Sequence, residues 1–287
     1  MLDGKIIKGV GGLYEVSTSD GAYKCVARGI LRRRGVTPTI GDDVTVRPSG
    51  DGLKEGAITA IKPRRSFLER PRVANIDAAL IVFAIKNPKF NASLLDRFLI
   101  SAAFYNVPAI ICFNKLDLLK EREKPAFDAM TDIYKNAGYR VELVSAETGA
   151  GLAELGAAFA GETTVCSGPS GVGKSSIINA LVSRYAMETG GLSEKIQRGK
   201  HTTRHAELLA LDNGGFIVDT PGFAAIDISD AAKKNMSAFF PEFSPYAGLC
   251  RFNDCKHLNE PDCAVKRRVG ADISPERYDR YVEFMTR

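Results

Sequence analysis

The stretch Gly168-Pro169-Ser170-Gly171-Val172-Gly173-Lys174-Ser175 fits the phosphate-binding pattern G-x-x-x-x-G-K-[ST] without a mismatch. Its glycines let the backbone turn so that several N–H groups point at phosphate oxygens. Lys174 adds a positive charge near the β- and γ-phosphates, and the Ser175 hydroxyl is a ligand for Mg²⁺. Residues 163–167 have the pattern of a short buried strand, and residues 175–182 have that of a helix. A glycine turn without a ligand is the alternative, and the strand and helix disfavour it.

Length and composition indicate a folded protein with more than one domain. The 287 residues have room for two domains and a small third element, and 45% apolar with 25% charged residues is typical of globular proteins. No apolar run reaches the roughly eighteen residues of a membrane span, and residues 1–5 are not those of a signal peptide. We therefore expect a cytoplasmic protein with no membrane association, and we expect it to be a monomer.

The N-terminal quarter carries the excess positive charge. Residues 1–65 hold 12 Lys and Arg against 7 Asp and Glu, which accounts for the net charge of +5, and they include Arg32-Arg33-Arg34. This charge suggests a polyanionic partner, with a solvated basic loop as the alternative. Short alternating segments between turn signals predict about five strands over residues 1–62. They favour a small barrel of the OB type, with an SH3-like barrel as its rival.

Beyond residues 62–72, whose prolines and charges indicate a linker, the pattern changes to alternating strands and helices. Continuous apolar runs predict buried strands, and helical stretches lie between them. The strands are expected at residues 78–85, 109–113 and 141–144, and the helices at residues 93–105 and 123–137. This alternation predicts a parallel sheet with helices on both faces, in which ligands bind at the carboxyl ends of the strands.

Two polar loops at those strand ends predict guanine recognition. Asn114-Lys115-Leu116-Asp117 fits the N-K-x-D pattern, and Ser145-Ala146-Glu147 follows the next strand. The Asp117 carboxylate would accept bonds from guanine N1–H and the 2-amino group, while Asn114 supports the N7/O6 edge. The Ala146 N–H would bond guanine O6, and the Lys115 stem would pack on the base. Adenine would leave the Asp117 carboxylate unpaired, at a cost of about 1–3 kcal/mol or more.

A third element, Asp219-Thr220-Pro221-Gly222, follows a strand at residues 215–218 and fits D-x-x-G. Asp219 would hold Mg²⁺ through water, and the Gly222 N–H would meet the γ-phosphate. The polar segment 188–205 contains Thr202 and Thr203. One of these is expected to be the second hydroxyl ligand to Mg²⁺, with Thr203 slightly favoured, on a loop ordered by the γ-phosphate.

The motifs do not include the residue that commonly orients the attacking water. Phe223 stands directly after D-x-x-G, where many GTPases have a Gln that orients water. Slow intrinsic turnover is therefore expected. His201 is the candidate for that role, and an ordinary surface histidine is the alternative.

The order of these motifs is unusual. The N-K-x-D and Ser-Ala loops precede the phosphate loop, whereas an ordinary small GTPase has them after D-x-x-G. A circular permutation, with the old ends joined near residues 150–162, explains this order. The site survives such a cut because strand-end geometry depends on the sheet and not on chain order.

Four potential metal ligands lie together near the C-terminus, in the order Cys250-x4-Cys255-x-His257-x5-Cys263. Three thiolates and one imidazole form a complete tetrahedral set for a structural zinc ion. Buried cysteines without a metal are the alternative. The metal would hold together a segment that we expect to have little core of its own. Cys25, Cys112 and Cys166 stand singly in apolar runs and are expected to pack in the core.

Together these motifs resemble one family closely, the circularly permuted ribosome small-subunit-dependent GTPase A family (RsgA, also called YjeQ or YloQ). The resemblance covers nearly the whole chain. It implies an OB-type β-barrel at residues 1–65, a central α/β circularly permuted P-loop GTPase at 66–230 and a small helical zinc-binding domain at 231–287. It also implies a GTPase that acts late in 30S maturation, is stimulated by the small subunit and contacts 16S rRNA.

The motifs together predict the following site residues. GTP or GDP would be bound by Asn114, Lys115, Leu116, Asp117, Ser145, Ala146, the loop from Gly168 to Ser175 (Gly168, Pro169, Ser170, Gly171, Val172, Gly173, Lys174, Ser175), Ser176, Asp219 and Gly222. Catalysis would involve Lys174, His201 and Thr203, with Mg²⁺ on Ser175, Thr203 and Asp219. Zn²⁺ would be held by Cys250, Cys255, His257 and Cys263. Two rivals remain: a nucleotide kinase, which has no use for N-K-x-D, and a nucleic-acid-binding module with a degenerate nucleotide site.

Overall fold

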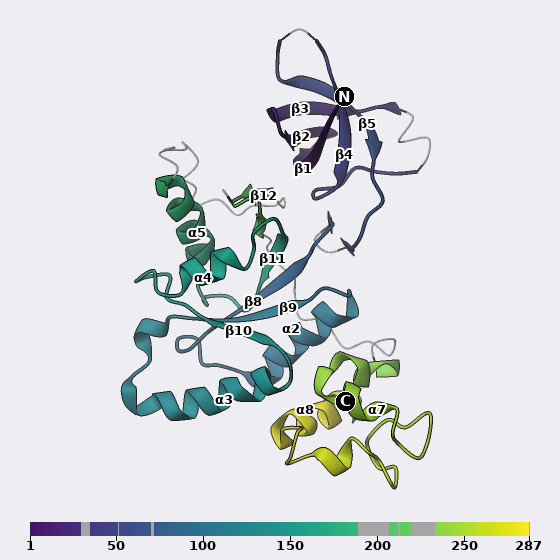
Figure 1. Ribbon diagram of the computed structural model, residues 1–287, viewed down its shortest axis with the longest axis vertical. Coiled ribbons are helices and arrows are strands. Elements are labelled where there is room, and N and C mark those ends of the chain that lie inside the picture. Colours follow the sequence, from purple (N-terminus) through teal and green to yellow (C-terminus); the bar gives the residue numbers. More distant parts are fainter. Residues whose placement is uncertain are drawn as a thin grey trace. The chain divides into compact units, whose positions relative to one another are not determined.

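The computed structural model describes residues 1–29, 35–50, 52–69, 72–188, 207–211, 213–219 and 233–286 (Figure 1). These form two compact units. The first comprises Met1–Ala79, Leu152–Ser167 and Lys174–Phe223, and the second comprises Leu80–Gly151, Gly168–Gly173 and Ala224–Arg287. Among the helices in the described ranges, none is long and apolar enough to cross a membrane.

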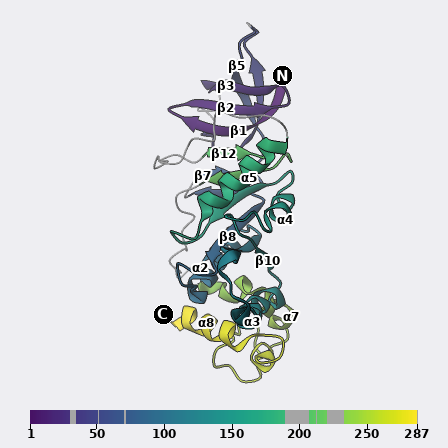
Figure 2. The same ribbon diagram turned by 90° about the vertical axis from the view of Figure 1, so that its left-hand side faces the viewer.

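The N-terminal part of the first unit is a closed five-stranded barrel (Figures 1 and 2). Its strands are β1 (Leu2–Val10), β2 (Leu13–Thr18), β3 (Gly21–Ala27), β4 (Asp43–Pro48) and β5 (Glu55–Ile61). The order is β1-β2-β3-β5-β4, β1 pairs with β4 to close the barrel, and only β3 and β5 are parallel. Alternate residues such as Ile6, Val16 and Val44 fill the interior. The barrel is of the predicted OB type.

The segment that we interpreted as a linker, residues 62–72, contains packed structure in its described part, so that interpretation is wrong. Strands β6 (Phe67–Glu69) and β7 (Arg72–Ala74) pair antiparallel, and Leu68 and Val73 are fully buried. Arg64 Nε lies 2.7 Å from an oxygen of the buried Asp42. The Ala74 N–H donates to the Ile40 carbonyl oxygen at 2.8 Å. An ion pair and a backbone hydrogen bond therefore join this part of the chain to residues just before β4.

Six strands form one sheet in the order β10-β9-β8-β11-β13-β12. They are β8 (Ala78–Ala84), β9 (Ala109–Asn114), β10 (Arg140–Leu143), β11 (Thr163–Ser167), β12 (Glu207–Ala210) and β13 (Phe216–Asp219). The pairs β10–β9 and β11–β13 are parallel, as predicted, whereas the edge strand β12 is antiparallel to β13. Every residue of β8 is buried, which agrees with its continuous apolar sequence.

The helices follow local sequence signals. They are α2 (Ala92–Phe104), α3 (Lys124–Asn136), α4 (Leu152–Ala157) and α5 (Lys174–Glu188). The Asn91 side chain accepts a bond from the Leu94 N–H, 3.0 Å away, and so caps the start of α2. Two short 3-10 turns, η1 (Leu116–Leu118) and η2 (Glu121–Glu123), lie between β9 and α3.

The C-terminal segment contains short elements around an aromatic core. These are η4 (Met236–Phe239), η5 (Pro241–Phe243), α7 (Ser244–Ala247), η6 (Lys266–Arg268) and α8 (Pro275–Thr286). Phe240, Phe243, Tyr281 and Phe284 are buried in one cluster with Ile100 of α2. The expectation that this segment has little core of its own is therefore wrong, because its aromatic residues pack together and onto α2. Ser274 caps α8, its Oγ accepting from the Arg277 N–H at 3.3 Å.

Candidate nucleotide site and metal centre

The phosphate loop connects the buried strand β11 to the N-terminus of α5. Gly168, Gly171 and Gly173 have φ angles of +136°, +79° and +93°, which residues with a side chain rarely adopt. Lys174 begins the 15-residue helix α5. The N-terminal N–H groups of a helix and its dipole favour an anion, so the described backbone is suited to phosphate binding.

Gly168 also allows the loop to approach β8 closely. A Cβ at this position would lie 2.1 Å from the Val82 carbonyl oxygen. We expect Gly168→Ala to displace the loop and to weaken GDP binding more than tenfold, since a displacement costing about 1.4 kcal/mol suffices for that. Equilibrium titration with a fluorescent GDP analogue measures this effect.

Gly161→Ala is the matched control for this substitution. Gly161 also has a positive φ of +71°, but no atom lies within 4 Å of its added Cβ. This variant should lose about 1–2 kcal/mol of stability from backbone strain and keep its affinity for GDP. Equal GDP affinities for the two variants would contradict the role given to the contact between Gly168 and Val82.

The N-K-x-D loop is bonded directly to the phosphate loop. Asn114, the last residue of β9, is buried and donates from Nδ2 to the Val172 carbonyl oxygen at 2.9 Å. Lys115 has a left-handed backbone, with φ +67°, and donates from Nζ to the Gly171 carbonyl oxygen at 2.9 Å and to that of Asn87. Two segments more than fifty residues apart therefore share one hydrogen-bond network.

The Ser-Ala loop after β10 orients Asp117. Ser145 is fully buried, and its hydroxyl donates to Asp117 Oδ1 at 2.5 Å. Ser145 Oγ in turn accepts from the Thr148 N–H at 3.2 Å. The Ala146 N–H, which we expected to face guanine O6, donates to Asn114 Oδ1 at 3.1 Å. Ser145 thus fixes one carboxylate oxygen of Asp117, and Ala146 fixes the Asn114 amide.

The remaining predicted residues are described only in part. Ser175 and Ser176 lie in the first turn of α5, and Asp219 is the last residue of β13. Because β11 and β13 are parallel, the ends that carry the phosphate loop and Asp219 lie at the same edge. The side chain of Asp219 and the residues His201, Thr202, Thr203, Gly222 and Phe223 lie outside the described part of the chain.

The loop after β8 also belongs to this network, although its sequence carries no recognised motif. The Asn87 carbonyl oxygen accepts a bond from Lys115, and Lys86 Nζ donates to the Leu118 carbonyl oxygen at 3.1 Å, one residue after Asp117. This loop lies at the carboxyl end of a buried strand, as the two recognised loops do. The same rule about strand ends could therefore have found it.

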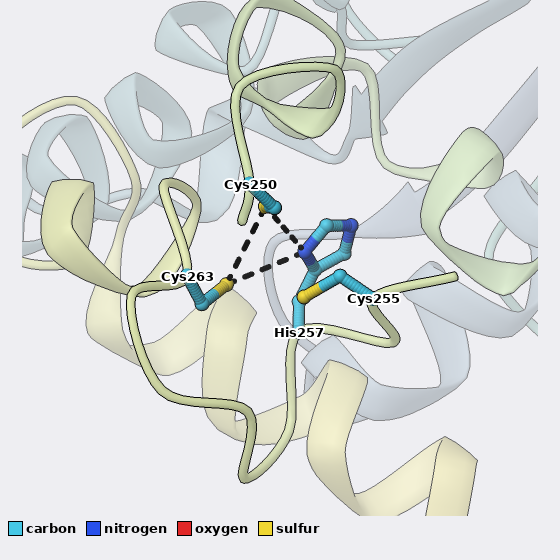
Figure 3. A group of neighbouring side chains, drawn as sticks. All are labelled: Cys250, Cys255, His257 and Cys263. Atoms are coloured by element: carbon cyan, nitrogen blue, oxygen red, sulfur yellow. Dashed lines mark hydrogen bonds between the residues drawn. The ribbon is translucent and has the colours of Figure 1, made fainter. Parts of the chain in front are cut away.

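The four predicted zinc ligands form a compact cluster (Figure 3). Their ligand atoms all lie within 4.8 Å of one another, and Cys250 Sγ is 3.9 Å from Cys263 Sγ. His257 Nδ1 is 3.5 Å from the first sulfur and 3.4 Å from the second. A tetrahedral zinc ion places two sulfurs about 3.8 Å apart and a sulfur and a nitrogen about 3.5 Å apart. The cluster is therefore compatible with one structural zinc ion.

The chain around the cluster is fixed by hydrogen bonds. The Ala264 N–H donates to Cys250 Sγ at 3.4 Å, and the Tyr278 hydroxyl donates to the His257 carbonyl oxygen at 2.8 Å. His257 has a φ of +59° and is buried. Burial lowers the pKa of His257 and Glu260 partly opposes this, which favours the neutral imidazole that binds metals.

Removal of the metal is expected to destabilise the C-terminal segment. Elemental analysis of the purified chain should find about one zinc ion per chain, and Cys263→Ser should lose it. Because binding energy of a structural zinc is folding energy, the free energy of unfolding should fall by at least about 3 kcal/mol. Cys112→Ala is the control: it leaves a cavity in the core but should keep the zinc content. Full zinc in Cys263→Ser would contradict the assignment.

The fold and the bonded loops define a class of protein. A phosphate loop joined by hydrogen bonds to an N-K-x-D loop that precedes it in the chain is the arrangement of a circularly permuted P-loop GTPase. The family model of the RsgA GTPase matches residues 61–229, and that of the RsgA N-terminal domain matches residues 3–58. The chain belongs to the RsgA GTPase family.

Known relatives and solved structures are similar to this chain over nearly their whole length. The small ribosomal subunit biogenesis GTPase RsgA of Clostridium kluyveri is 46% identical over 98% of this chain and 96% of the relative. That of Alkaliphilus metalliredigens is 43% identical over 99% and 97%. The crystal structure of YloQ, a circularly permuted GTPase, has a TM-score of 0.85, 35% identity and coverage of 100% and 94%. The crystal structure of YjeQ from Thermotoga maritima has a TM-score of 0.85, 32% identity and coverage of 99% and 97%.

Proposed function

We propose that this protein hydrolyses GTP to GDP and phosphate in the late maturation of the 30S ribosomal subunit, and that the subunit stimulates its activity. The observation that carries the enzymatic part is the bonding of Asn114 and Lys115 to the carbonyl groups of the phosphate loop. These bonds support the proposal, because they join the loop proposed to recognise guanine to the loop proposed to bind the phosphates. The ribosomal part is supported by relatives named small ribosomal subunit biogenesis GTPase.

The proposed site assigns a role to each group of residues. Backbone N–H groups of residues 168–175 bind the phosphates, Lys174 neutralises charge on the β- and γ-oxygens, and Asp117 reads the guanine edge. Ser175, Asp219 and Thr203 are oxygen ligands of the kind that Mg²⁺ prefers, and a bound Mg²⁺ would neutralise phosphate charge. His201 orients the attacking water, which the apolar Phe223 cannot do. The Gly222 N–H meets the γ-phosphate.

The flanking parts are proposed to bind the ribosome. We divide the chain into a barrel at 1–65, a GTPase core at 66–230 and a zinc-binding domain at 231–287. The basic barrel suits contact with 16S rRNA, because phosphate neutralisation dominates such binding. We propose a cytoplasmic monomer that does not associate with membranes.

Phosphate release from GTP and ATP tests the enzymatic part. The wild-type chain should release phosphate from GTP in the absence of any acceptor, slowly and in preference to ATP, and Lys174→Ala should not. Phosphate transfer that requires an acceptor would indicate a kinase. Guanine nucleotide binding without turnover, even with 30S subunits, would indicate a binding module with a degenerate site.

A further inference from the structure

Two lysines connect the same two loops in opposite directions. Lys115 reaches from the loop after β9 to the Asn87 carbonyl oxygen in the loop after β8. Lys86 reaches from the loop after β8 to the Leu118 carbonyl oxygen, 3.1 Å away. Asp117 stands between Lys115 and Leu118 in the chain. Residues on both sides of Asp117 are therefore bonded to residues 86–87, Lys115 through its side chain and Leu118 through its carbonyl oxygen.

Lys86 is held in this position by a second partner. Its ammonium group also bonds the Glu123 carboxylate, which accepts the Lys120 N–H at 3.0 Å and so closes the turn before α3. The Lys86 hydrogen bond is the main cause that lowers the pKa of Glu123, so the carboxylate stays charged at neutral pH. Both side chains are about one-third exposed, 32% for Lys86 and 35% for Glu123. The ion pair is therefore partly exposed, and each side chain has a second hydrogen-bond partner. For Lys86 this is the Leu118 carbonyl oxygen, and for Glu123 it is the Lys120 N–H.

The turn that carries Asp117 has little stability of its own. The turn η1 spans three residues and is closed by single bonds, from the Leu118 N–H to the Lys115 carbonyl oxygen and from the Leu119 N–H to that of Leu116, each 3.0 Å. Short 3-10 turns have poor hydrogen-bond geometry. Ser145 fixes the Asp117 side chain. The Leu116 N–H donates to the Val144 carbonyl oxygen at 3.0 Å and fixes the first residue of the turn. Lys86 holds the last residue of the turn through the Leu118 carbonyl oxygen.

We propose that Lys86 is a positioning residue for guanine selectivity, which holds η1 so that both oxygens of Asp117 face the N1–H and the 2-amino group of the base. This inference rests on the proposed function, since it requires that the site bind guanine nucleotides. Lys86 acts through the Leu118 carbonyl oxygen and does not touch the base. Its loss tilts Asp117 and affects mainly the bond that reaches farthest, the one to the 2-amino group.

Guanine and hypoxanthine nucleotides distinguish this role from general support of the fold. Hypoxanthine lacks the 2-amino group and cannot use the second Asp117 bond. Removing a charged hydrogen bond at a partly exposed site should weaken GDP binding about fivefold in Lys86→Met. IDP binding should weaken about twofold or less, so the GDP/IDP preference falls. ADP binding, which Asp117 does not assist, should not change.

The test measures dissociation constants of GDP, IDP and ADP for the full chain by displacement of a fluorescent GDP analogue. Lys86→Arg should restore the GDP/IDP ratio, because a guanidinium can reach the same two acceptors. Glu123→Gln, which removes the partner that holds Lys86, should give an intermediate ratio. Lys89→Met, an exposed lysine in the same loop, is the matched control and should behave as wild type. Melting temperatures of the unliganded variants should agree within about 2 °C.

A fall in the GDP/IDP ratio with rescue by Lys86→Arg supports the inference. An unchanged ratio, or equal losses for all three nucleotides, overturns it while leaving the proposed function intact. A wild-type chain that binds ADP as tightly as GDP overturns the proposed function, and the inference with it.

Discussion

Asp117→Asn is expected to weaken GTP and GDP binding by about 10- to 100-fold and to transfer the preference to xanthine nucleotides. A donor of the bound base that loses its acceptor costs about 1–3 kcal/mol, which corresponds to this range. The Asn amide group presents a donor where the carboxylate presents an acceptor, so it opposes the guanine 2-amino group. Xanthine has a carbonyl oxygen at that position and accepts from the amide. Ser145 can still donate to Asn Oδ1, as it does to Asp117 at 2.5 Å, so the loop should keep its position.

Competition between GDP and XDP for a fluorescent guanine nucleotide measures this change. Asp128→Asn on the exposed surface of α3 is the control, with the same change of charge and unaltered specificity. An Asp117→Asn chain that still prefers GDP over XDP would show that the N-K-x-D loop does not read the base.

Arg277→Met is expected to lower the free energy of unfolding by about 3–5 kcal/mol, since it leaves the buried Glu242 without its cation and Asp96 with Arg280 alone. Arg277 is 1% exposed and lies 2.6 Å from an oxygen of Asp96 and 2.7 Å from an oxygen of Glu242. Its guanidinium carbon is 4.7 Å from the centre of the Phe240 ring. Asp96 is on α2, Glu242 is in η5 and Arg277 is on α8, so one cation joins three elements of the second unit.

Unfolding in urea measures the free energy of unfolding of Arg277→Met and of two further variants. Arg267→Met, at an exposed position of the same segment, should change stability by less than about 0.5 kcal/mol. Adding Glu242→Gln to Arg277→Met should recover part of the loss, because the uncompensated charge of Glu242 is then gone, whereas Asp96 keeps its pair with Arg280. A loss below about 0.5 kcal/mol for Arg277→Met would contradict the role of the buried cation.

The sequence predicted the elements whose signal is local. Buried strands such as residues 78–85 and 109–113 are continuous apolar runs, and the polar loops at strand ends carry recognisable motifs. The four zinc ligands could be predicted because they lie within fourteen residues of one another. In such cases spacing alone brings the functional atoms together.

Contacts between residues that are far apart in the sequence could not be predicted in this way. Residues 62–72 appeared to be a linker because the partner of Arg64, the buried Asp42, comes from another part of the sequence. The burial of Arg277 could not be predicted from its neighbours in the sequence, since its partner Asp96 precedes it by 181 positions. Lys86 lies in a loop without a motif. Its role depends on a bond to the Leu118 carbonyl oxygen. Because every residue has a backbone carbonyl group, the residue type at position 118 does not indicate this bond.

GTP hydrolysis by the wild-type chain in the presence of purified 30S, 50S and 70S particles tests the central claim most directly. We predict slow turnover of the chain alone, a large increase with 30S subunits, and no increase with 50S subunits. The 30S-dependent increase should be absent in Lys174→Ala. Equal rates with and without 30S subunits would contradict the assignment to small-subunit maturation.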